Sequence, residues 1–291
     1  MNAQKASMLV LLVTLGWGSS YLFMKMGLGS IEEFNLIALR FGIAFLITGA
    51  LFFKRLKRID KTTVKYGAFL GLILFGVFAF ITFGLKTTSS SNAGFLVGLT
   101  VIFVPLLHVL FYRKRLAENH LLGAIIAIIG IGLLTLNSDL RVHPGDVLCI
   151  AGGICNALYI LVTSAAVKKT DSINLGIVSL GFTAGYGLLF SFIFESPALP
   201  HTPSGWIAIL ALSLICSAFG FIAQPVAQKY LAPTQTGLMY AMEPVFAALF
   251  AFLFVGEILT MQGYIGAMLV LAGVFISQWR SYRKEALTPS A

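Results

Sequence analysis

The chain has 291 residues, of which 58% are hydrophobic and only 11% are charged, and its mean hydropathy is +0.92. Soluble domains carry about 25% charged residues, so this composition excludes a soluble fold. The net charge of +9 does not indicate nucleic-acid binding, because the basic residues lie in short connectors between apolar stretches, where they face anionic lipid headgroups. We therefore expect a protein whose main partner is the lipid bilayer and that binds no nucleic acid.

Ten apolar stretches follow one another along the chain, each of roughly 20 residues, which is the length that crosses a bilayer as a helix. They lie near residues 6–27, 34–53, 64–85, 91–112, 120–137, 145–166, 175–195, 205–228, 234–255 and 260–279. The predicted fold is therefore all-α, a polytopic membrane protein of ten transmembrane helices.

The lysines and arginines gather on one side of these stretches. The opposite side holds only Lys86 and Arg141, and Lys25 and Arg40 lie within spans. The other 16 of the 20 basic residues lie in connectors and termini on the same side: Lys5, Lys54, Arg55, Lys57, Arg58, Lys61, Lys65, Arg113, Lys114, Arg115, Lys168, Lys169, Lys229, Arg280, Arg283 and Lys284. The positive-inside rule then predicts an integral protein of the plasma (inner) membrane with both termini in the cytoplasm.

The first span carries an aromatic and polar stripe. Trp17, Tyr21 and Lys25 recur at helical spacing and so share one face of a helix. We interpret Trp17 and Tyr21 as substrate-binding residues, with aromatic packing as the alternative. Lys25 lies near the outer end of the span, where it either attracts a substrate carboxylate or extends its ammonium group to the membrane surface.

Spans 2 and 4 add charged, polar and helix-breaking residues. Arg40 has Glu32 and Glu33 nearby in sequence, which favours a structural ion pair. In span 4, Thr100 lies at mid-depth and is a substrate-binding candidate. Pro105 cannot donate a backbone hydrogen bond and therefore predicts a helix break, and freed carbonyls in membranes tend to line cavities.

Spans 6 and 8 contribute amide and phenol side chains at helical spacing. Asn156 and Tyr159 lie on one face of span 6, and Gln224 belongs to a similar stripe on span 8. Pro225 predicts a second helix break beside Gln224. Such residues suit the wall of a cavity for a small amphipathic molecule.

Span 9 holds the acid that lies deepest in the predicted membrane. Glu243 is the tenth residue of a span that begins near residue 234, which places it roughly 14 Å into a core about 30 Å thick. An ionisable group at that depth costs about 2.5–3.5 kcal/mol and usually has a function. Glu243 either takes up a proton or pairs with a substrate ammonium, or it stays protonated for packing. Tyr240 shares its face, and Pro244 predicts a third break.

The two halves of the chain resemble each other. A shift of 143 residues superposes residues 94–134 on residues 237–277 without a gap, and it aligns three pairs of glycines and places Thr100 opposite Glu243. We expect one repeat in residues 1–140 and a second in residues 141–291. Because five spans is an odd number, the second repeat enters the membrane from the opposite side, which is the inverted arrangement typical of alternating-access transporters.

Three motifs indicate a family. The chain resembles EamA-type carriers of the drug/metabolite transporter superfamily in three segments: WGSSYLFMK (residues 17–25), GLMYAMEPVFAALFAFLFVGEILT (237–260) and GYIGAMLVLAGVFIS (263–277). The resemblance implies two inverted five-helix halves, a central cavity lined mainly by spans 1, 3, 4, 6, 8 and 9, and export of amino acids or related metabolites. The first half departs from the pattern, because Val101 and Lys114 replace the Pro and Glu of the second half.

These features predict a secondary transporter rather than an enzyme. No GxxxxGK[ST] phosphate loop occurs, so we expect a gradient to supply the energy, with a small molecule as substrate and no cofactor. A passive facilitator or an importer is the alternative. An intramembrane lipid-modifying enzyme would need clustered acid, base or metal ligands, whereas the four histidines are scattered and predict no metal site. Glycine-rich faces suit packing within one chain or in a homo-oligomer.

Overall fold

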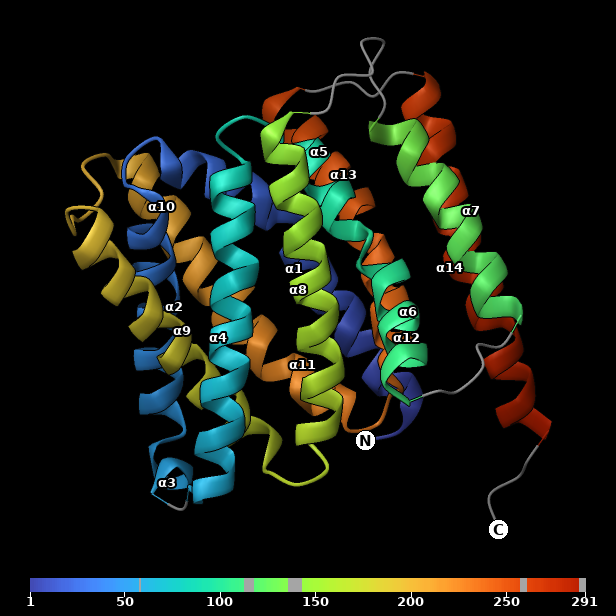
Figure 1. Cartoon of the computed structure of the whole chain (residues 1–291), viewed down its shortest axis with the longest axis horizontal. Coiled ribbons are helices and arrows are strands. Elements are labelled where there is room, and N and C mark those ends of the chain that lie inside the picture. Colours follow the sequence, from blue (N-terminus) through green and yellow to red (C-terminus); the bar gives the residue numbers. More distant parts are fainter. Residues whose placement is uncertain (58, 113–117, 136–142, 257–260, 288–291) are drawn as a thin grey trace.

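The computed structural model describes residues 1–57, 59–112, 118–135, 143–256 and 261–287. Within these ranges the regular structure is entirely helical. Seven helices in the described residues are long and apolar enough to cross a membrane, and three further apolar helices are shorter. The seven agree with their predicted ranges to within three residues at each end. The described part of the chain is thus all-helical, and its apolar helices are those of a polytopic membrane protein (Figure 1).

The helices of the first half follow in this order: α1 (Ala3–Leu28), α2 (Glu33–Leu51), the short α3 (Phe53–Leu56), α4 (Lys61–Gly84), α5 (Ser90–Gly98), α6 (Thr100–Tyr112) and α7 (Glu118–Thr135). Those of the second half are α8 (Pro144–Ala166), α9 (Ser172–Phe194), α10 (Pro203–Ala211), the π-helix η1 (Leu212–Phe219), α11 (Gly220–Gln228), α12 (Pro233–Met239), the 3-10 helix η2 (Tyr240–Met242), α13 (Glu243–Val255) and α14 (Met261–Leu287).

Three of the predicted spans are interrupted, and each interruption precedes the proline that the sequence singles out. Span 4 breaks at Leu99, span 8 contains η1, and span 9 contains η2. Pro105 and Pro225 themselves lie inside α6 and α11, and Pro244 is the second residue of α13. A proline clashes with the carbonyl four residues before it, which accounts for η2, because Tyr240 lies four residues before Pro244. The breaks at Leu99 and in η1 lie further upstream of Pro105 and Pro225.

Short polar side chains begin several helices. Ser89 and Asp171 accept hydrogen bonds from the first free backbone N–H groups of α5 and α9. Asp60 does the same for α4 and also accepts from the Thr63 hydroxyl, and these hydrogen bonds lower the pKa of the exposed Asp60 carboxyl. The caps fix where the chain turns back into the membrane.

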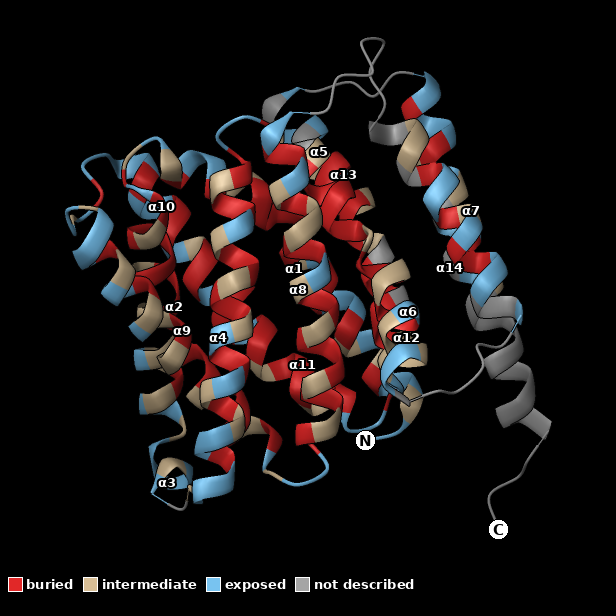
Figure 2. Ribbon diagram, in the orientation of Figure 1, coloured by how far each residue is buried: buried red, intermediate tan, exposed pale blue. Residues whose placement is uncertain are grey.

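Glycines allow the helices to approach each other closely. A Cβ atom on Gly71 of α4 would lie 2.6 Å from the Cβ of Phe182 in α9, and one on Gly273 of α14 would lie 2.5 Å from the Gly123 carbonyl oxygen in α7. Small residues at such contacts drive association where lipid removes the hydrophobic effect. The buried residues accordingly face the inside of the bundle, whereas exposed apolar residues cover its outside (Figure 2). The pair α7–α14 lies at one side of the bundle (Figure 1).

One end of the bundle, the upper end in Figure 1, is tied together by charged and aromatic groups. The Glu195 carboxylate, which follows α9, accepts hydrogen bonds of 2.8 Å from the N–H groups of Phe34 and Asn35 in α2. Glu33 pairs with Lys86 at 2.5 Å. The Phe34 ring contacts aromatic side chains of α4 and α9: Phe75, Phe83, Phe190 and Phe194. We call this set the tied end. It links α2, α4 and α9.

Candidate binding site inside the helix bundle

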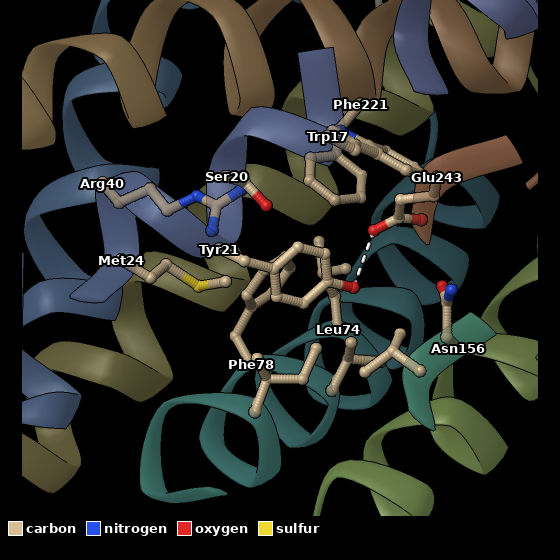
Figure 3. A pocket seen from close by; sticks show the side chains of 13 residues that line it. Trp17, Ser20, Tyr21, Met24, Arg40, Leu74, Phe78, Asn156, Phe221 and Glu243 are labelled. Atoms are coloured by element: carbon tan, nitrogen blue, oxygen red, sulfur yellow. Dashed lines mark hydrogen bonds between the residues drawn. The ribbon is translucent and has the colours of Figure 1, made fainter. Parts of the chain in front are cut away.

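A small cavity lies between helices of both halves of the chain (Figure 3). The residues that line it combine aromatic and aliphatic side chains with five that carry a hydroxyl, guanidinium, amide or carboxyl group. They come from α1, α2, α4, α5, α8, α11 and α13: Trp17, Ser20, Tyr21, Met24, Arg40, Leu74, Val77, Phe78, Ile81, Val97, Asn156, Phe221 and Glu243. The volume open to the centre of a water molecule is ≈ 20 Å³, which is room for about one water. The surrounding side chains therefore close the cavity and fill almost all of its space.

The Tyr21 hydroxyl donates a hydrogen bond of 2.7 Å to Oε1 of Glu243, which joins α1 to α13 at the cavity (Figure 3). Both side chains are buried, with Tyr21 2% and Glu243 6% exposed. Gly18 explains this approach, because a Cβ atom there would lie 2.5 Å from the Cβ of Phe246. Gly18 precedes Tyr21 by three residues and Phe246 follows Glu243 by three, so the close contact lies one turn from the hydrogen bond on both helices.

Trp17 is held by the π-helical turn. Its indole Nε1 donates a hydrogen bond of 2.8 Å to the carbonyl of Cys216 in η1. The ring lies over Gly220, where a Cβ atom would come within 2.4 Å of Nε1. Its centroid is 4.8 Å from that of Phe221 and 5.0 Å from that of Tyr240. The π-turn and the glycine thus position Trp17 against spans 8 and 9.

Arg40 is the charged residue of this cavity that sequence reasoning did not assign to the binding site. Its side chain is completely buried, and Nε donates a hydrogen bond of 2.7 Å to Oγ of Ser217. The guanidinium carbon lies 4.2 Å from the ring centroid of Phe78 and 5.1 Å from that of Phe41, distances typical of cation–π contacts.

The expected ion pair of Arg40 with Glu32 or Glu33 is wrong. Glu33 pairs with Lys86 instead. The physical reason is helix geometry, because seven residues of helix separate Glu33 and Arg40 by about 10 Å, too far for direct contact. The informative signal was depth: Arg40 lies two turns inside its span, where a cation needs a partner or a cavity.

Thr100 and Asn156 form a link beside the cavity. The Thr100 hydroxyl hydrogen-bonds the carbonyls of Val97 and Gly153, at 2.7 and 3.1 Å. Nδ2 of Asn156 lies 3.4 Å from the Thr100 hydroxyl. Asn156 lines the cavity, whereas Thr100 joins span 4 to span 6 behind it.

The remaining predicted residues lie around the cavity or away from it. Tyr240 packs on Trp17, and the Tyr159 ring contacts Phe221 at a centroid distance of 5.9 Å. Gln224 donates a hydrogen bond of 3.2 Å to Gln228, but its Oε1 and the Tyr240 hydroxyl are buried without a hydrogen-bond partner. Lys25 is exposed and does not line the cavity. The structure thus brings Trp17, Tyr21, Asn156 and Glu243 together at the cavity, whereas Tyr159, Gln224 and Tyr240 are buried but do not line it.

Comparison with known proteins gives matches along the chain. The model of the EamA-like transporter family matches residues 4–136 and 143–279. An uncharacterized transporter of Archaeoglobus fulgidus is 28% identical, over 96% of this chain and 99% of that protein. The uncharacterized transporter YyaM of Bacillus subtilis is 26% identical, over 88% of each chain.

Two further matches bear on fold and function. A probable terminal-alkyne amino-acid exporter of Streptantibioticus cattleyicolor is 23% identical, over 99% of both chains. A solved crystal structure of a protein superposes with a TM-score of 0.78 over 97% of this chain and 99% of that chain, at 22% identity. The structural match shows that the whole fold has been observed before.

Proposed function

The chain belongs to the EamA-like transporter family of the drug/metabolite transporter superfamily, and from this premise we propose that it is a secondary carrier that exports amino acids or related small metabolites. Its membership and its apolar helices make it a transmembrane transporter. The amino-acid substrate class is supported by the name of the exporter of Streptantibioticus cattleyicolor. We further propose transport by alternating access and coupling to an ion gradient.

The buried Tyr21–Glu243 pair is the observation that carries this proposal. An acid at this depth, hydrogen-bonded across a closed cavity, can exchange a proton or receive a substrate ammonium as the cavity opens to one side and then the other. Trp17, Asn156 and Phe221 provide aromatic and amide contacts around it. A cavity with room for one water fits an occluded state, in which neither side has access.

Two inverted five-helix halves, residues 1–140 and 141–291, are the architecture we propose for the ten spans. The family model matches twice, once in each half. The helix breaks support the same relation, because the 143-residue shift carries Leu99, where span 4 breaks, onto Met242, the last residue of η2 in span 9. Breaks at equivalent points of two repeats are typical of carriers that bind their substrate near mid-membrane.

The test compares metabolites outside cells that overproduce the protein with those outside cells that carry an empty vector. We expect one amino acid or related compound to accumulate outside, and Glu243→Ala to abolish the difference. Glu32→Ala is the matched control, because Glu32 is an exposed carboxylate outside the cavity. The protein level and gel-filtration profile of each variant show whether it folds.

Two results would contradict the proposal. Unchanged export by a folded Glu243→Ala variant would remove Glu243 from the mechanism. In liposomes, a substrate flux that neither depends on pH nor drives protons would replace the coupled carrier with a passive facilitator.

A further inference from the structure

Arg40 is a buried charged group that the coupling mechanism does not use. Its side chain has no exposed surface, and Nη1 and Nη2 have no hydrogen-bond partner. A guanidinium ion stays charged at any physiological pH, and leaving its N–H donors unpaired away from water is costly. Two unpaired donors beside a cavity therefore indicate that they bind a group which enters that cavity.

The neighbours of Arg40 hold it in place without using those two nitrogens. Ser217 binds Nε, and the Phe78 and Phe41 rings lie against the guanidinium group. The nearby acids are engaged elsewhere: Glu33 pairs with Lys86, and Glu243 accepts from Tyr21. Figure 3 shows Arg40 and Glu243 on opposite sides of the cavity with the Tyr21 ring between them.

We propose that Nη1 and Nη2 of Arg40 bind the carboxylate of the transported substrate. The planar fork of a guanidinium group matches the two oxygens of a carboxylate, which is the geometry of the strongest charge-assisted hydrogen bonds. The inference rests on the proposed function and refines it: the substrate is a zwitterion whose ammonium faces Glu243 and whose apolar side chain packs against Trp17, Phe78 and Phe221.

The small size of the closed cavity also constrains how a substrate can enter it. With room for about one water, it admits a substrate only after its walls separate. Ser217 precedes α11 in η1, and Glu243 begins α13 directly after η2. Ser217, which holds Arg40, and Glu243 therefore both lie at interruptions of the helices, where the backbone departs from regular α geometry.

The experiment uses the purified full chain in liposomes. Uptake of labelled leucine, methionine and phenylalanine is measured by counterflow, and the corresponding amides and decarboxylated amines are added as competitors. We expect each amino acid that moves to compete at least about 10-fold more strongly than its amide, because a charge-assisted bidentate contact is lost. In Arg40→Gln the apparent affinity for the amino acid should fall about 10- to 100-fold while the affinity for the amide changes little.

Two further variants separate a binding role from a structural one. Arg40→Lys keeps the charge but not the fork, so it should restore only part of the preference for the carboxylate. Lys65→Gln removes an exposed positive charge from α4 and should leave the preference as in the wild type. The melting temperature of each variant in detergent shows that its fold is retained.

The outcomes distinguish this inference from the proposed function. Transport of an amino acid with equal competition by its amide would overturn the role of Arg40 and leave the carrier intact. A preference for the carboxylate that survives in Arg40→Gln would do the same. Failure of the wild-type protein to move any of the three amino acids would overturn the inference of an apolar zwitterion as substrate, and the export comparison described above would then decide on the proposed function separately. If Arg40→Gln does not fold, Arg40→Lys takes its place, and an undiminished preference for the carboxylate in that variant would overturn the role of the guanidinium fork.

Discussion

At the scale of single residues, the candidate site depends on contacts between positions far apart in the sequence. Tyr21 and Glu243 are 222 residues apart, and so their hydrogen bond exists only because Gly18 lets α1 reach α13. Trp17 likewise depends on a carbonyl in η1 and on the missing side chain of Gly220. Glu243 and Trp17 are thus each positioned with the help of a glycine on the helix that faces them.

Tyr21→Phe tests the hydrogen bond to Glu243. The substitution keeps the ring and removes only the hydroxyl donor. We expect the initial rate of transport in liposomes to fall about 10-fold or more, because a hydrogen bond to a charged group is worth roughly 1.5–3 kcal/mol. Tyr230→Phe, which removes an exposed hydroxyl, is the control. Equal rates in both variants would mean that Glu243 functions without its tyrosine partner.

The sequence alone predicted part of this site, and there is a physical reason why it did not predict the rest. Depth in the membrane singled out Glu243, and helical spacing put Trp17 and Tyr21 on one face. The partner of Arg40 was mistaken, because closeness along the sequence does not tell which way a side chain points. Only the packing of α2 against η1 shows that Arg40 meets Ser217.

At the scale of helices, hydropathy predicted where the long spans lie but not where they are interrupted. A π-helix such as η1 has no distinctive amino-acid composition, because it differs from an α-helix only in that each backbone hydrogen bond spans one residue more. The prolines gave the approximate position, but the backbone departs from α geometry before them. The three interrupted spans all contribute residues to the cavity or its surroundings.

Two glycines on α9 provide a test of close helix packing. A Cβ atom on Gly187 would lie 2.8 Å from the backbone nitrogen of Ala38 in α2, whereas one on Gly185 would meet nothing within 4 Å. We expect Gly187→Ala to lower the free energy of unfolding by about 1–3 kcal/mol, because the backbone of α2 must move. Gly185→Ala, two residues away, should be neutral or slightly stabilising. Thermal unfolding in detergent measures both, and equal melting temperatures would contradict this packing.

At the scale of the whole molecule, the distribution of basic residues predicts which face lies in the cytoplasm. His201 lies in the connector between α9 and α10 and Lys57 follows α3, at opposite ends of the bundle, and both are exposed. We expect a membrane-impermeant maleimide added to intact cells to label His201→Cys but not Lys57→Cys, and to label both after permeabilisation. The wild type, with its three native cysteines, gives the background. Labelling of Lys57→Cys alone would reverse the proposed orientation.

The tied end makes the two faces of the molecule unequal. To open it, α2 must release both hydrogen bonds to Glu195, Lys86 must leave the buried Glu33, and the aromatic contacts of Phe34 must part. At the other end, Arg55 and Asp171 pair at 3.6 Å with both side chains about half exposed, an interaction worth at most about 1 kcal/mol. In the proposed orientation the empty carrier therefore rests with its weaker closure towards the cytoplasm. The weaker closure thus lies on the side from which the proposed exporter would load its substrate, whereas the direction of net transport is set by the gradients.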